Sequence, residues 1–308
     1  MKNASSAIAI HRDALFGVAF AILAAVGFSA KAILVKLAYL DTVDAVTLLA
    51  LRMAFSVPFF LAVALWARTT HAEALDKQDW MAVLGLGLIG YYLSSFLDFL
   101  GLQTISAGLE RLILFLYPTM TVILSALVYR RAIGRKVVAA MVLSYAGILL
   151  VFSHDAGMSR GGIVLGASLV FASTLSYSVY LVGAGHAIAR IGAARFTAYA
   201  MIVASAASLL QFGATRPLAA LDLPLRVYEL AIAMAIFSTV LPVFLLSAGI
   251  RRIGSGNASL IGTIGPVATI YLAHVFLNES VSIQQLAGSL LVLIGVITVS
   301  INSKNGAK

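Results

Sequence analysis

A stretch of the chain is repeated after 148 residues without a gap, and this internal repeat constrains the fold more than any other feature of the sequence. The first copy runs from Leu100 to Ile133 and the second from Ala248 to Val281. Glycines and prolines coincide in the two copies: Gly101 with Gly249, Gly108 with Gly256, and Pro118 with Pro266. The apolar run that follows keeps the register, since Gly147 falls on Gly295. Two related structural units are therefore expected.

Apolar runs fill most of the chain. Of the 308 residues, 61% are hydrophobic and 11% charged, with a mean hydropathy of +1.02, whereas a soluble globular chain carries about 25% charged residues. This composition predicts an integral membrane protein, because too few polar groups remain to cover a water-facing surface. We expect an all-α polytopic fold with ten transmembrane helices, near residues 14–35, 45–66, 80–102, 107–129, 136–153, 161–184, 194–212, 227–249, 256–277 and 282–301. The first run lacks a small-residue cleavage site and is expected to be retained as a span.

Lys and Arg residues are distributed unevenly between the two sides of these spans, and this asymmetry sets the expected orientation. With the amino terminus inside, 14 of them fall in inside segments and 4 in outside segments. The inside group is Lys2, Arg12, Arg68, Lys77, Arg130, Arg131, Arg135, Lys136, Arg190, Arg195, Arg251, Arg252, Lys304 and Lys308, and the outside group is Lys36, Arg160, Arg216 and Arg226. Both termini are therefore expected in the cytoplasm. The net charge of +9 reflects this topology and not an affinity for nucleic acid.

The repeat divides the ten expected spans into two units of five, residues 1–156 and 157–308. Because five is odd, the second unit must cross the membrane upside down relative to the first. Inverted repeats of this kind place a substrate site near the middle of the membrane, between the two units. The sequence therefore predicts a transporter that opens first to one side and then to the other, by alternating access.

Several short motifs make the chain resemble the drug/metabolite transporter superfamily, and specifically its EamA-like ten-helix exporters. They are Ser106-Ala-Gly108 with Pro118, Ser255-Gly-Asn257 with Pro266, Asn278-Glu279, Gln285-Leu-Ala-Gly288 and Gly295. The first half departs from the second in having Arg131 where the second has Glu279. The resemblance covers essentially the whole chain. It implies export of amino acids and related metabolites across the bacterial inner membrane, through a cavity lined by helices 1, 3, 4, 6, 8 and 9.

Five ionisable residues lie inside the apolar runs, where charge is costly and function is the default interpretation. Asp98 lies about one turn from the end of its run, and Glu110 and Arg111 about one turn into the next. The short connection makes those helices neighbours, so the three are expected to cluster at the outer mouth of a cavity. The alternative is a structural cluster in which Asp98 neutralises Arg111. Lys31 has the alternative of reaching outward to water, and Arg52 lies on a helix that the resemblance places at the periphery.

Aromatic and hydroxyl side chains mark further candidate positions. Tyr91, Ser94, Ser95 and Asp98 have the spacing of one helix face. In lipid such a face looks toward protein or water, so it lines either a cavity or a packing seam between helices. The full substrate-binding set expected from the sequence is Tyr91, Tyr92, Ser94, Ser95, Asp98, Glu110, Arg111, Tyr177, Tyr180, Ser238, Thr239 and Asn257.

Other chemistries find no support in the sequence. The five histidines are scattered without metal-ligand spacing, no cysteine is present, and no glycine-rich phosphate loop or nucleophile constellation is recognisable. We therefore expect no cofactor, no metal, no catalytic residue and no nucleic-acid partner, but a small-molecule substrate, the lipid bilayer and a monomeric state. Three alternatives remain: an exchanger of anionic or phosphorylated metabolites, suggested by Lys31, Arg52 and Arg111, an intramembrane enzyme, and a membrane scaffold without transport.

Overall fold

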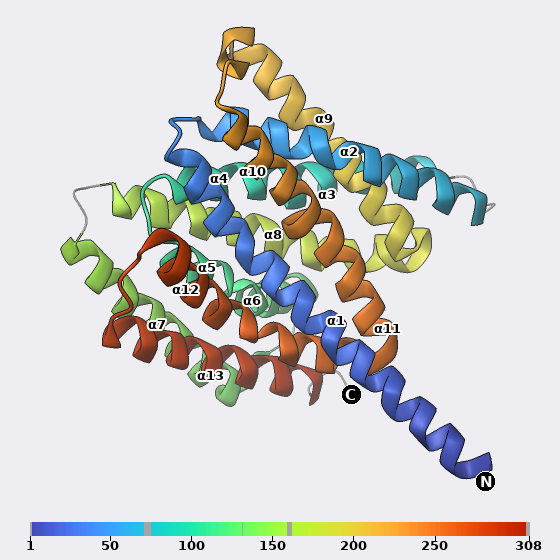
Figure 1. The fold of residues 1–308 in the computed structure, drawn as a ribbon. Coiled ribbons are helices and arrows are strands. Elements are labelled where there is room, and N and C mark those ends of the chain that lie inside the picture. Colours follow the sequence, from blue (N-terminus) through green and yellow to red (C-terminus); the bar gives the residue numbers. More distant parts are fainter. Residues whose placement is uncertain (1, 71–74, 131, 159–161, 306–308) are drawn as a thin grey trace.

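The computed structural model describes residues 2–70, 75–130, 132–158 and 162–305, and every regular element within these ranges is a helix (Figure 1). The elements are α1 (Lys2–Tyr39), α2 (Ala45–Thr70), α3 (Lys77–Gly87), η1 (Leu88–Leu93), α4 (Ser94–Leu102), α5 (Ala107–Leu114), α6 (Tyr117–Tyr129), α7 (Arg135–Met158), α8 (Ile163–Ile191), α9 (Ala193–Thr215), η2 (Leu218–Leu221), α10 (Leu225–Ala235), η3 (Ile236–Val240), α11 (Leu241–Gly262), α12 (Ile264–Leu277) and α13 (Ile283–Asn305). The expectation of an all-α polytopic membrane protein is confirmed at this level.

Within the described ranges, 9 helical segments are long and apolar enough to cross a membrane. They match nine of the ten expected spans, with ends displaced by a few residues. The expected span 256–277 is different, because its first part belongs to the end of α11 and only α12 (Ile264–Leu277), a shorter apolar helix, represents the rest. A break at Gly254, where φ is 79°, separates the first part from the preceding span.

Two prolines explain why helices end inside expected spans. Proline has no N–H and cannot donate to the carbonyl four residues earlier. Pro118 therefore frees the carbonyl of Leu114, and α5 ends at that residue. Pro266 likewise frees the carbonyl of Gly262, where α11 ends. The two breaks lie 148 residues apart, so the repeat found in the sequence is also present in the backbone.

Two further irregularities follow the same spacing. A turn of π-helix, η1, starts at Leu88, and another, η3, starts at Ile236. The two residues with left-handed φ that end α6 and α12 are Arg130 (φ 50°) and Asn278 (φ 53°), again 148 positions apart. The residue types at these positions differ between the two halves, so comparison of the two repeats in the sequence could not reveal these backbone features. They show that the two halves have equivalent backbones.

Equivalent helices also pack in equivalent ways (Figure 1). Helix α1 packs along α11, and α8 packs along α4 and η1, while α7 lies against α13 and α2 against α9. Gly17 lies close to Gly249 where α1 crosses α11, and Gly166 meets Gly101 where α8 crosses α4, in the second case with no room for a Cβ atom between the backbones. Small residues let membrane helices approach this closely. Each half therefore completes its packing only with the other half.

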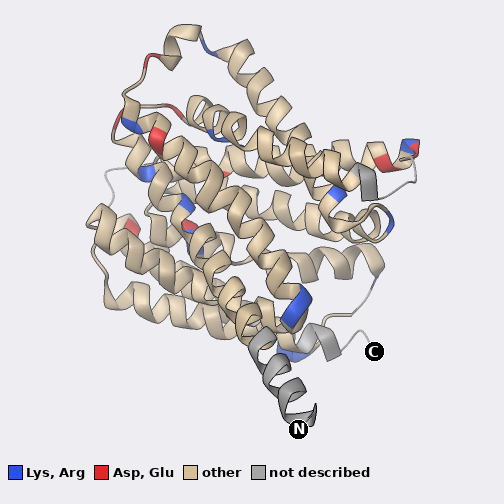
Figure 2. Cartoon of the chain, turned by 45° about the vertical axis from the view of Figure 1, so that its right-hand side comes forward, with Lys and Arg blue, Asp and Glu red and all other residues tan. Residues whose placement is uncertain are grey.

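Charged residues are concentrated near the ends of the helices, as Figure 2 shows. Few lie along the middle of the bundle, as expected for helices whose outer surfaces face hydrocarbon. Long apolar side chains such as Leu127 and Leu210 are more than 70% exposed on this outer surface. The charged residues that are buried in the interior are therefore exceptions that need a physical reason.

Candidate substrate-binding site

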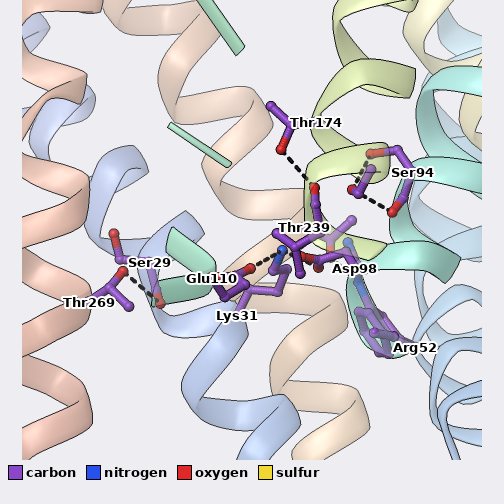
Figure 3. Close-up of polar contacts among 12 residues, drawn as sticks. Ser29, Lys31, Arg52, Ser94, Asp98, Glu110, Thr174, Thr239 and Thr269 are labelled. Carbon is purple, nitrogen blue, oxygen red and sulfur yellow. Dashed lines mark hydrogen bonds and ion pairs between the residues drawn. The ribbon is translucent and has the colours of Figure 1, made fainter. Parts of the chain in front are cut away.

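Lys31 is held by two buried carboxylates in the interior of the bundle. Its Nζ lies 2.5 Å from Asp98 Oδ2 and 3.0 Å from Glu110 Oε1, which places α1, α4 and α5 around one ammonium group. Glu110 is completely buried, and Asp98 is 2% exposed. Figure 3 shows Lys31 lying between these two carboxylates. The expected cluster of Asp98 with Glu110 exists, but its cation is Lys31, which does not reach outward to water.

The start of α5 fixes the position of Glu110 and Arg111. Ser106 caps the helix by accepting a hydrogen bond from the N–H of Leu109 (3.0 Å), which is the usual role of serine at this position. Glu279, from the loop after α12, accepts from the N–H of Ala107 (3.1 Å). The two halves of the chain therefore fix this helix end together.

Lys31, Asp98 and Glu110 form what we call the triad. Arg52 lies beside the triad and has no carboxylate partner among the described residues. Its Nε donates to Thr239 Oγ1 (2.9 Å) on η3, and its guanidinium lies 5.5 Å from the centre of the Phe99 ring. Among the described residues it forms no salt bridge. Arg52 is 7% exposed, so the helix that carries it points a charge into the core. The resemblance placed that helix at the periphery, but the side chain of Arg52 is buried in the core.

Arg111 has a different neighbour from the one considered in the sequence. A Cβ atom added to Gly265 would lie 2.5 Å from Arg111 Nη2, so the guanidinium packs directly against the backbone at the start of α12. Arg111 also forms no salt bridge among the described residues. It is not the partner of Asp98 in an ion pair. It lies within electrostatic range of Asp98 and Glu110 but keeps its guanidinium on α12.

Several buried polar atoms in this region have no hydrogen-bond partner in the part of the chain that the structure describes. Buried polar groups are usually paired, so such atoms point to a ligand, an ion or water. The unpartnered donors are Arg52 Nη1, Arg111 Nε and Ser238 Oγ, and the unpartnered acceptors are Asp98 Oδ1 and Glu110 Oε2. The region therefore offers donors and acceptors together, which is what a small polar molecule with charged groups of both signs requires.

A group of tyrosines adjoins this region on the side of α8. The hydroxyls of Tyr91 and Tyr180 lie 2.9 Å apart, and Tyr177 stacks on Tyr180 with ring centres 5.5 Å apart. The sequence-predicted Tyr91, Tyr177 and Tyr180 thus come together. Tyr117 extends the group, since its ring meets Tyr177 edge-on at 5.8 Å. Sequence reasoning missed Tyr117, although its place next to the helix-breaking Pro118 could have indicated it.

The remaining expected positions are placed less centrally. Ser94 Oγ lies 3.0 Å from Ser173 Oγ, so this serine is part of the seam between α4 and α8. Tyr92 is half-buried and stacks on Phe96, and Ser95 is half-buried on α4. Thr239 is buried and accepts from Arg52, and Ser238 is buried next to it. Asn257 is exposed, and its amide donates to a carbonyl of its own helix.

A cavity of about 230 Å³ opens at the end of the bundle near Glu279. We call this end the Glu279 end. The cavity was not anticipated from the sequence, because its walls come from loops and helix ends that are distant in the chain. Ser106 donates to Asp155 Oδ2 (2.6 Å) at its rim. Its lining includes Thr104, Ser106, His154, Asp155, Glu279 and Gln285. No group of three or more potential metal ligands occurs among the described residues.

Helices of membrane-spanning length, paired halves and a buried set of opposite charges between those halves define a polytopic membrane protein of the transporter class. The sequence profile of the EamA-like transporter family matches residues 15–153 and again 164–301. The chain belongs to this family. The double match agrees with the equivalence of the two halves.

Individual relatives support the same assignment. The chain is 31% identical to the uncharacterized transporter YcbK of Bacillus subtilis (strain 168). The alignment spans 283 residues and covers 90% of each chain. It is 25% identical to the uncharacterized transporter YyaM of the same organism, over 81% of this chain and 82% of the other. A protein of known crystal structure that is 20% identical superimposes with a TM-score of 0.62, over 94% of this chain and 98% of the other, and shows a shared fold.

Proposed function

We propose that the protein is a secondary transporter that exports small metabolites, specifically amino acids, across the bacterial inner membrane by alternating access. The observation that carries this proposal is the buried group of unpartnered donors and acceptors around Lys31, in a chain of a transporter family. In this proposal the ten helical passages form two inverted five-helix units, residues 1–156 and 157–308. Both termini lie in the cytoplasm, and the Glu279 end faces outward.

The chemistry of the site suits a zwitterion. An ammonium group needs acceptors, and Asp98 Oδ1 and Glu110 Oε2 are available. A carboxylate needs donors, and arginine guanidinium groups bind carboxylates with strong charge-assisted hydrogen bonds. The tyrosines next to the site offer flat apolar walls with polar tips, which suit the side chain of an amino acid.

The equivalence of the two halves supports alternating access. If two units with the same backbone exchange conformations, the site that lies between them changes the side from which it is reached. The broken helices α5/α6 and α11/α12 and the π turns η1 and η3 are in equivalent places, so each conformation of one half has a counterpart in the other. Irregular backbone at membrane depth is tolerated where it lines a cavity.

Flux measurements in reconstituted vesicles test this proposal. Purified protein should give saturable counterflow of amino acids, and Tyr91→Ala should lower the initial rate by about tenfold, which corresponds to roughly 1.4 kcal/mol of lost stabilisation. Leu210→Ala is the matched control, because it also truncates a large side chain, on the lipid-facing surface where Leu210 is 73% exposed. No saturable flux of any amino acid would contradict the proposal.

An exchanger of anionic or phosphorylated metabolites is the second candidate. It is favoured by one observation, the lack of carboxylate partners for Arg52 and Arg111 among the described residues. The same counterflow assay distinguishes the two candidates when phosphorylated sugars are included beside the amino acids. Uptake of phosphorylated sugars alone would favour the exchanger.

A further inference from the structure

The buried charges around the site do not balance. Three cations, Lys31, Arg52 and Arg111, face two carboxylates, Asp98 and Glu110. All five lie inside helical segments that are long and apolar enough to span a membrane. The group therefore carries one formal positive charge in excess. A single uncompensated charge at such a depth is costly, and its usual explanation is a partner of opposite sign.

The excess charge resides on the two arginines. Both carboxylates are bound to Lys31, through Asp98 Oδ2 at 2.5 Å and Glu110 Oε1 at 3.0 Å. Among the described residues, Arg52 donates only to the neutral hydroxyl of Thr239, and Arg111 packs on Gly265. The triad by itself is negative and the arginines beside it are positive. The site is thus divided into a part that attracts an ammonium group and a part that attracts anionic groups.

Further charges lie at the Glu279 end. Lys36 Nζ donates to the carbonyl of Ile105 (2.7 Å), and its charge is compensated by Asp155 and Glu279, whose carboxylates lie within electrostatic range of it and line the open cavity. Neither carboxylate forms an ion pair with Arg52 or Arg111 among the described residues. Asp155 and Glu279 are only half-buried, so solvent screens them more strongly than the five charges of the site. They do not replace a partner for the arginines.

We propose that the site is selective for amino acids that carry one net negative charge, with an ammonium group and two carboxylates. The ammonium would bind the free oxygens of Asp98 and Glu110, and the carboxylates would bind the guanidinium groups of Arg52 and Arg111. Such a substrate brings the total charge of the occupied site to zero. This inference rests on the proposed transport of amino acids and specifies the class of substrate.

Two pairs of amino acids test the inference, because the members of each pair have nearly the same shape and differ by one charge. They are glutamate with glutamine, and aspartate with asparagine. In counterflow at neutral pH, the acidic member of each pair should be transported at least about tenfold more efficiently, since hydrogen bonds to charged groups contribute this much. The ratio of two fluxes in the same vesicles does not depend on the fraction of correctly folded protein.

Variants then assign the selectivity to the arginines. Arg52→Gln and Arg111→Gln should each reduce the glutamate-to-glutamine ratio by about tenfold. The conservative variants Arg52→Lys and Arg111→Lys keep the charge and should retain a preference for glutamate. Lys136→Gln removes a positive charge from an exposed position at the start of α7 and should leave the ratio unchanged.

The outcomes separate this inference from the proposed function. Glutamine transported as efficiently as glutamate, or a glutamate preference that survives both glutamine substitutions, would overturn the charge selectivity and leave amino-acid transport intact. Absence of saturable flux for these four amino acids, with flux of others, would also overturn the charge selectivity alone. Absence of saturable flux for every amino acid of a full panel would overturn the proposed function, and the charge selectivity with it.

Discussion

Lys31 owes its burial to the two carboxylates that surround it. A lysine inside a membrane-spanning helix is stable only where its charge is compensated. Asp98 and Glu110 provide that compensation from two other helices, so the ion pairs tie α1 to α4 and α5. Removal of the ammonium would leave two carboxylates in contact with each other and with no cation bound to them. The triad is therefore expected to act as a unit in stability as well as in binding.

We expect Lys31→Met to destabilise the protein by about 3–5 kcal/mol, the range found when one partner of a buried ion pair is removed. The triple variant Lys31→Met/Asp98→Asn/Glu110→Gln removes the charges together and should be clearly more stable than Lys31→Met. Thermal unfolding of the purified protein in detergent measures both. Lys136→Met is the control for a lysine at an exposed position. Equal stability of Lys31→Met and this control would show that the triad contributes nothing.

The sequence indicated the charged residues of the candidate site but not the contacts they make. Asp98 and Glu110 were expected to cluster, because a short loop joins their helices, and they do. The cation between them comes from α1, and the position of α1 against α4 depends on packing across distant parts of the chain. Arg52 was assigned to a peripheral helix, yet its long side chain reaches η3. Contacts of this kind depend on side-chain reach and helix rotation, which periodicity does not determine.

Among the helices, the breaks at the two prolines could be predicted, and the two π turns could not. Proline acts through a missing donor, so its effect on the helix can be inferred from residue type alone. A π turn arises where one extra residue is accommodated in a helix, and no single residue type signals it. Such turns often occur at functional sites, and η3 holds both Ser238 and Thr239 of the candidate site.

Ion pairs lie at equivalent places near the opposite ends of the two halves. At one end Arg190 of α8 binds Asp79 of α3, with Nη2 2.6 Å from Oδ1. At the other end Asp41, which follows α1, lies 3.7 Å from Arg226 of α10. Position 190 corresponds to position 41 at a shift of 149, and position 226 is adjacent to the equivalent of position 79. The two contacts are related by the repeat, with the charges exchanged.

Asp76 strengthens the contact at the start of α3. The backbone N–H of Asp79 donates to the side chain of Asp76 (2.8 Å). This hydrogen bond, together with the nearby Arg190, lowers the pKa of Asp76. A lowered pKa means that the interaction is present at neutral pH and is lost only when the pH falls through the lowered value. The contact between α3 and α8 is therefore expected to persist over the physiological pH range.

We predict that these contacts bias the side from which the site is reached. Arg190→Glu should favour opening toward the cytoplasm, and Arg226→Glu opening toward the outside. Because the pairs are partly exposed, each is expected to contribute about 1 kcal/mol, or up to about a fivefold change in population. The chain lacks cysteine, so a single Ser95→Cys reporter labelled by an impermeant maleimide from each side measures accessibility.

Restoration of the pair by a charge exchange controls for nonspecific damage. The double variant Asp79→Arg/Arg190→Asp should return labelling from the cytoplasmic side toward that of the parent protein. If Arg190→Glu and Arg226→Glu shift labelling in the same direction, the two contacts do not oppose one another. The prediction that each contact closes its own end of the bundle would then be wrong.

For the whole molecule, the repeat and the apolar runs were sufficient to predict two related helical halves, but not how they fit together. The close contacts of Gly17 with Gly249 and of Gly166 with Gly101 occur between halves and not within them. Glycine marks a possible close approach in a sequence without naming its partner. The sequence also could not place the cavity at the Glu279 end, because two separate loops and the ends of α7, α8 and α13 line it.

Opposite orientation of the two halves is the property on which alternating access depends, and equivalent loop positions test it directly. Ala132, after α6, corresponds to Ser280, after α12, at a shift of 148, and both are exposed. In the cysteine-free chain, we predict that Ser280→Cys is labelled by an impermeant maleimide from outside intact cells, whereas Ala132→Cys is labelled only after the membrane is permeabilised. Asn257→Cys, exposed at the end of α11, should behave like Ala132→Cys. If Ala132→Cys and Ser280→Cys were labelled from the same side, the two halves would cross the membrane in the same sense, and exchange of their conformations would no longer move the site from one side to the other.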